Sequence, residues 1–64
     1  MTTNTLYRLC NANDLFTCGT NEQYDKLFDL ARNDATIEEL AVAIWICSEG
    51  KTLAEIAHLA KNAN

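Results

Sequence analysis

Three short motifs of one kind constrain the fold of this chain more than any other feature. Each is a threonine followed three residues later by glutamine or glutamate: Thr20 and Gln23, Thr36 and Glu39, Thr52 and Glu55. In such a capping box the threonine hydroxyl accepts a hydrogen bond from a free amide of the first helical turn, and the Gln or Glu side chain bonds back to the threonine amide. Apolar residues at helical spacing follow each motif, so the sequence predicts three helices that begin there.

The predicted helices cover about residues 21–32, 37–48 and the stretch after Thr52. A shorter first helix over residues 5–12 is predicted from the helical spacing of Leu6, Leu9 and Cys10. The chain contains no proline and only two glycines, and Gly50 is expected to take the left-handed conformation that ends the third helix. The expected fold is therefore all-α, a single domain over residues 1–64 that forms a small bundle of three to four short helices.

A chain of 64 residues is close to the size at which one hydrophobic core barely outweighs the conformational entropy lost on folding. The connector between the first two helices carries Leu15 and Phe16, which we expect to reach the core. The predicted core consists of Leu9, Leu15, Phe16, Leu27, Phe28, Leu40, Ile44, Leu53 and Ile56.

The third predicted helix has apolar residues on both of its sides. One side carries Leu40 and Ile44, and the other carries Val42, Trp45 and Ile46. A helix that is apolar all round must be covered all round, but a domain of this size hides only about 60% of the surface of its chain.

Three interpretations of this helix remain open. It can be the central rod of the bundle, with Trp45 beneath the first helix. The residues Val42, Trp45 and Ile46, with Glu49, can instead form an interface for a protein partner or a second copy, because tryptophan is enriched at binding hot spots. Val42, Ile44 and Ile46 also alternate as in a buried strand, although the Thr36 capping box and Gly50 favour a helix.

Nine acidic residues against five basic ones give a net charge of −4. This balance disfavours binding to the phosphate backbone of a nucleic acid, so nucleic acid is not the expected partner and a basic protein fits better. An ordinary solvated surface accounts for most acidic residues, and carboxylates also favour helix starts. The candidate acidic face consists of Glu22, Asp25, Asp29, Asp34, Glu38 and Glu39.

Few residues in the sequence are candidates for metal binding or catalysis. With His58, the cysteines Cys10, Cys18 and Cys47 contain the ligand types that zinc prefers, but no pair has the close spacing of a zinc site. Cys18 precedes the predicted helix 21–32, whose positive end favours a thiolate, and is a candidate reactive thiol. Since His58 is the single neutral-pH base, we expect no enzyme, catalytic residue, metal or cofactor.

The odd number of cysteines favours a reducing, cytoplasmic location. The start of the sequence lacks the pattern of a secretory signal. The longest apolar run, residues 40–47, is shorter than the roughly 20 residues of a membrane-spanning helix, so no membrane association is expected.

The segment from Ser48 to Ala60, which reads Ser-Glu-Gly-Lys-Thr-Leu-Ala-Glu-Ile-Ala-His-Leu-Ala, resembles the front half of a helix-turn-helix. The resemblance implies a supporting helix that is followed by a recognition helix with basic residues. Only Lys61-Asn-Ala-Asn64 follows in this sequence. Because of the resemblance in residues 48–60, a DNA-associated regulator is an alternative function.

Residues 14–24 and 43–50 resemble small uncharacterised helical proteins carried on phages and conjugative elements of anaerobic gut bacteria. This resemblance implies an accessory or host-modulating role and offers no catalytic residue to carry over. It also leaves open an inhibitor that imitates the charge of DNA through its acidic face, as some anti-CRISPR proteins do. The expected function is a noncatalytic protein-interaction module, with a homodimer or a protein partner docked on the third helix.

Overall fold

The computed structural model describes residues 1–63, which form four helices and no strand. These are α1 (Thr3–Ala12), α2 (Asn21–Arg32), α3 (Ile37–Ile46) and α4 (Leu53–Asn62). The all-α prediction is confirmed, and the alternative of a buried strand around Ile44 is wrong. Helix α2 has the predicted bounds, whereas α1 begins two residues earlier than expected and α3 ends two residues earlier.

The threonine motifs begin α2, α3 and α4 as predicted. At α2 the Thr20 hydroxyl accepts from the Gln23 amide at 3.2 Å, and Gln23 Oε1 accepts from the Thr20 amide at 2.8 Å. Thr52 and Glu55 form the same reciprocal pair at α4. At α3 the Thr36 hydroxyl accepts from the Glu39 amide and donates to Glu39 Oε1. Each helix start thus has a partner for an amide that the helix itself leaves free.

Helix α3 does not end at Gly50. Its last residue is Ile46, and Cys47 caps it at a φ of −86°, while Gly50 has a φ of +88° in the loop that follows. The left-handed conformation of Gly50 was predicted correctly, but it shapes the loop and not the helix end. At the end of α3 the Ser48 hydroxyl donates to the Ile44 carbonyl, and the Ser48 amide donates to the Trp45 carbonyl three residues back, in a tighter turn.

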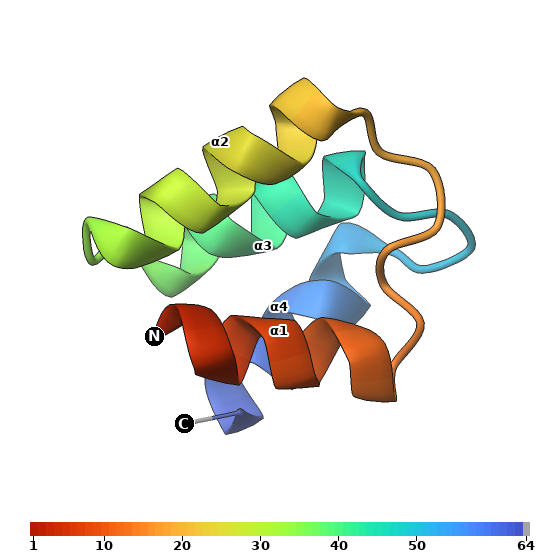
Figure 1. The fold of residues 1–64 in the computed structure, drawn as a ribbon. Helices are drawn as coiled ribbons and strands as arrows, with labels where there is room; N and C mark the ends of the chain where they lie inside the picture. Colours follow the sequence, from red (N-terminus) through yellow and green to blue (C-terminus); the bar gives the residue numbers. More distant parts are fainter. Residues whose placement is uncertain (64) are drawn as a thin grey trace.

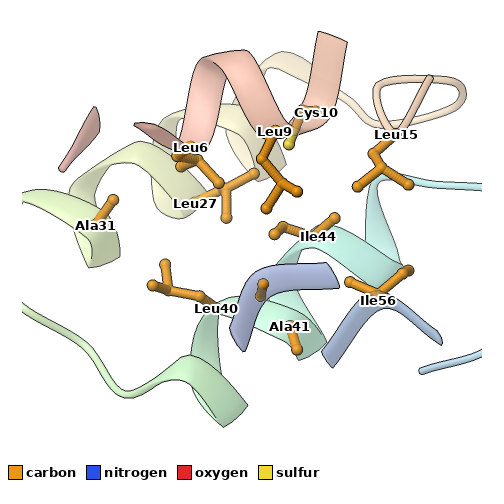
Figure 2. Packing of buried hydrophobic residues seen from close by; sticks show 11 residues of the cluster. Leu6, Leu9, Cys10, Leu15, Leu27, Ala31, Leu40, Ala41, Ile44 and Ile56 are labelled. Atoms are coloured by element: carbon orange, nitrogen blue, oxygen red, sulfur yellow. The ribbon is translucent and has the colours of Figure 1, made fainter. Parts of the chain in front are cut away.

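Helix α3 packs against both α2 and α4, and α1 packs against α2 (Figure 1). Figure 2 shows side chains of all four helices, together with Leu15, pointing into one core. Six predicted core residues are buried, and Phe16 and Phe28 are partly buried against them. The six are Leu9, Leu15, Leu27, Leu40, Ile44 and Ile56.

One predicted core residue is wrong. Leu53 is 39% exposed because it is the first residue of α4 and stands at the end of the helix's apolar stripe. Helix α4 instead buries Ile56 and the small Ala60. Six buried residues were absent from the predicted core: Leu6, Cys10, Ala31, Ala41, Cys47 and Ala60.

The connector between α1 and α2 is fastened to the end of α3. The amides of Thr17 and Cys18 both donate to the Cys47 carbonyl at 3.2 Å. The Ser48 hydroxyl bonds to the carbonyl groups of both Leu15 and Ile44. The bonds of Thr17, Cys18 and Leu15 join segments about thirty residues apart in sequence, and Phe16, between them, is partly buried.

Candidate interaction surface

Helix α3 is buried on one side and exposed on the other. Leu40, Ala41 and Ile44 are buried, whereas the exposed fractions are 42% for Val42, 46% for Trp45 and 48% for Ile46. We call these three exposed residues the α3 patch. The interpretation that Trp45 lies covered beneath the first helix is therefore wrong, and its indole faces solvent in the single chain.

A hollow of about 390 Å³ lies between α2 and α3 next to the patch. Its lining is mainly apolar and includes Leu30 of α2 with Val42, Ala43 and Ile46 of α3, together with Lys26 and Glu39. Cavities that accept a ligand or a large side chain usually measure about 300–1,000 Å³. The patch thus offers both protruding apolar side chains and a space that a partner's side chain can enter.

Carboxylates flank the α3 patch along the chain. Glu38 and Glu39 belong to the first turn of α3, and the fourth predicted interface residue, Glu49, is exposed in the loop after α3. The surface around the apolar centre is therefore negatively charged at both ends of the helix.

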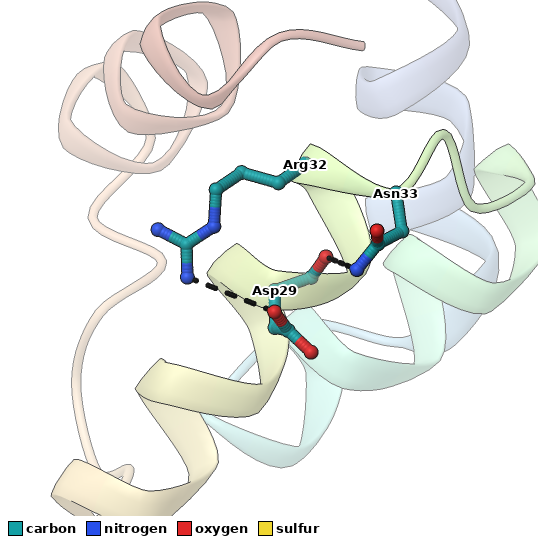
Figure 3. A network of polar contacts seen from close by, with 3 residues as sticks. All are labelled: Asp29, Arg32 and Asn33. Atoms are coloured by element: carbon teal, nitrogen blue, oxygen red, sulfur yellow. Dashed lines mark hydrogen bonds and ion pairs between the residues drawn. The ribbon is translucent and has the colours of Figure 1, made fainter.

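All six residues of the predicted acidic face are exposed. Glu22, Asp25 and Asp29 share one side of α2 by their spacing, and Asp29 Oδ1 lies 3.9 Å from Arg32 Nη2 (Figure 3). Asp34 occupies the turn after α2 with a φ of 56°. The remaining two, Glu38 and Glu39, oppose the dipole of α3 at its N-terminal end. Helix starts, a turn and an ion pair thus account for five of the six.

The three cysteines have different surroundings. Cys10 and Cys47 are buried, and Cys18 is exposed. Burial, together with the charge of Cys47, raises the pKa of the Cys10 thiol to about 12. Burial, followed by the charge of Cys18, also raises the pKa of Cys47. The Cys18 thiol donates to the Ser48 carbonyl at 3.2 Å.

The candidate chemical residues do not converge on a site in the part of the chain that the structure describes. Within residues 1–63, no three histidine, cysteine, aspartate or glutamate side chains are grouped to hold a metal ion. His58 is exposed on α4, with its Nε2 atom 3.2 Å from the side-chain nitrogen of Asn62. The segment that resembles a helix-turn-helix contains most of α4, which is the last helix among these residues.

A cluster of four aromatic rings was not predicted from the sequence. Tyr7 of α1, Phe16 of the connector, and Tyr24 and Phe28 of α2 line a pocket of about 250 Å³, which we call the aromatic pocket. Ring centroids lie 5.3 Å apart for Phe16 and Tyr24, and 6.1–6.3 Å apart for the other contacting pairs. The spacing of Tyr24 and Phe28 indicated a shared helix side, but nothing in the sequence pattern placed Tyr7 and Phe16 beside them.

The four helices of residues 1–63 are all too short to reach across a bilayer. Comparison of the chain with protein-family models, with curated proteins and with solved structures finds no match.

Proposed function

We propose that this protein is a noncatalytic interaction module that binds a second copy of itself through the α3 patch. The observation that carries the proposal is the exposure of Val42, Trp45 and Ile46, each close to half exposed, on a helix whose other side is buried. An exposed apolar patch on a small domain is typical of an interaction surface. An accessory role of this kind is also what the resemblance to mobile-element proteins implies.

The patch and the hollow beside it complement each other, which a symmetric dimer requires. In a two-fold dimer the same surface of both copies makes the contact, so it must carry a protrusion and a recess that fit together. Trp45 is exposed outside the hollow and supplies the protruding apolar side chain, and the space lined by Leu30, Ala43 and Ile46 supplies the recess.

The expected affinity is low. Full burial of a large apolar side chain contributes about 1.5–3 kcal/mol, so covering three half-exposed side chains on both copies contributes about 5–9 kcal/mol. Association itself costs about 4–15 kcal/mol in lost freedom of motion. The most favourable combination of these values leaves about 5 kcal/mol, so we expect a dissociation constant no lower than about 0.2 mM, which makes the dimer depend on concentration.

Sedimentation equilibrium over about 20 µM to 1 mM protein tests the proposal. We expect the mean mass to rise from that of the monomer towards that of the dimer. Trp45→Asp places a charge at the centre of the contact and should keep the chain monomeric with unchanged helical circular dichroism, since Trp45 is exposed.

Tyr7→Asp is the matched control. Tyr7 is also an exposed aromatic residue, but it contacts Phe28, outside the hollow that the α3 patch borders. Association should survive this change. A monomer at every concentration, or a dimer that Trp45→Asp leaves intact, would show that the α3 patch does not pair two copies.

A further inference from the structure

We propose that the aromatic pocket binds a small quaternary ammonium compound of the choline type. The carrying observation is that four aromatic side chains, Tyr7, Phe16, Tyr24 and Phe28, line the pocket. They come from three separate segments of the chain. Tyr7 is 54% exposed, so its ring forms part of the pocket wall and is not part of the buried core.

The distances between the rings suit a single cation. A cation is attracted to the face of an aromatic ring when it lies within about 6 Å of the ring centroid. Phe16 lies at the centre of the cluster, 5.3 Å from Tyr24 and 6.1 Å from both Tyr7 and Phe28. One positive charge above the pocket can therefore interact with several rings at once.

The ring orientations favour a rounded ligand over a flat one. The planes meet at 80° for Phe16 with Tyr24 and at 60° for Phe16 with Tyr7. The pair nearest to parallel, Tyr7 and Phe28, has centroids 6.3 Å apart, which leaves no room between the two rings for any ligand, so a ligand must bind on the open side of the cluster. From that side a roughly spherical trimethylammonium group can touch several rings inclined in this way, whereas a planar ring can stack on only one of them.

The polar groups of the pocket favour a fully methylated ammonium. A primary ammonium must replace the hydrogen bonds that its three donors make with water. The Tyr24 hydroxyl already accepts from the Gly19 amide at 3.1 Å, and the pocket volume of about 250 Å³ lies below the usual range for drug-sized ligands. A small head group without N–H donors meets both conditions.

The charges around the pocket are also compatible with a cation. Asp25 follows Tyr24 of the pocket in α2 and is exposed, whereas the charge of Asp29 is balanced by Arg32. The neighbouring cations face elsewhere or are engaged: Arg8 lines a separate hollow between α1 and α4, and Arg32 lies 3.9 Å from Asp29. The net charge of −4 adds a general attraction for cations.

Titration by NMR, with the ring signals of the tyrosines as the readout, tests this proposal. Choline is compared with 3,3-dimethylbutan-1-ol, which has the same shape but no charge, and with ethanolamine, which carries a primary ammonium. We expect saturable shifts at millimolar choline, with affinity at least about tenfold higher than for either analogue. Equal binding of the neutral isostere, or no response to choline, would overturn the proposal.

Two variants locate the binding. Tyr7→Leu removes an exposed ring and should weaken choline binding about fivefold or more, whereas Tyr7→Phe keeps the ring and should retain it. Trp45→Leu removes an equally accessible ring outside the pocket and should have no effect. Weakening by Trp45→Leu but not by Tyr7→Leu would contradict the site.

Phosphatidylcholine vesicles present the same head group in a packed layer. They show whether the protein binds the free compound or the head group of a membrane lipid. We expect the protein to bind free choline and to stay in solution when the vesicles are sedimented. Retention on vesicles without a response to free choline would mean that a membrane surface is the ligand, which is a different proposal.

Discussion

Cys10 is the residue whose chemistry most affects stability at high pH. Burial raises the pKa of its thiol from 9.0 to about 12, so the folded chain holds this proton more tightly than the unfolded chain does. The stabilisation is therefore fully present below about pH 9 and is lost as the pH rises towards 12. Three pKa units correspond to about 4 kcal/mol as an upper bound.

Urea unfolding at pH 8 and at pH 11 measures this loss. We expect the free energy of unfolding to fall further in the native chain than in Cys10→Ala, which lacks the buried thiol. Parallel losses in the native chain and in Cys10→Ala would mean that the Cys10 thiol does not couple folding to pH.

The two glycines should respond differently to the same substitution. A Cβ atom at Gly19 would lie 2.9 Å from Cys47 Cβ and from the Tyr24 ring, so Gly19→Ala should destabilise by about 1–3 kcal/mol through crowding. Gly50 has open space around it, but its φ is +88°, and Gly50→Ala should cost about 1 kcal/mol through backbone strain. Urea unfolding of Gly50→Asn separates the causes, because asparagine tolerates positive φ and should recover part of the loss.

At the scale of one helix, α3 offers a matched pair of isoleucines. Ile44 is buried, and Ile46 is nearly half exposed. Ile44→Ala should lower the free energy of unfolding by about 2–5 kcal/mol, and Ile46→Ala should lower it by less than about 1 kcal/mol. Urea unfolding of dilute protein checks both values, and similar losses would mean that the two sides of α3 are equally covered.

Helix starts were predictable because a local side chain determines them. The hydroxyl groups of Thr20, Thr36 and Thr52 bond to amides only three residues away, so the motif alone is enough to predict the capped helix start. The end of α3 was not predictable, because it depends on bonds between the loop at Ser48 and the distant Leu15. The start of α1 was missed because Thr2 caps it without a Gln or Glu three residues later.

The candidate surfaces were predictable only in part for a related reason. The pattern of α3 showed that two of its sides are apolar, but which of them faces the core depends on where α1, α2 and α4 pack. The rings of the aromatic pocket come together only through tertiary structure, so no spacing in the sequence joins Tyr7 to Phe16.

For the whole molecule, the charge distribution predicts how salt affects the proposed dimer. Each copy has a net charge of −4, and Glu38, Glu39 and Glu49 flank the α3 patch. Two such copies repel each other, and salt screens this repulsion. Sedimentation at about 20 and 500 mM salt should therefore show several-fold tighter association at the higher salt, whereas weaker association would indicate that ion pairs hold the copies together.

The bonds between the connector and the end of α3 also have a consequence for the order of folding. Helices α2 and α3 are neighbours in sequence and pack against each other, so they can assemble as a hairpin while the N-terminal segment is still loose. The amides of Thr17 and Cys18 find their acceptor at Cys47 only after α3 is complete and a long loop has closed. Slow hydrogen exchange at these two amides would then report the final closing step rather than the formation of any helix.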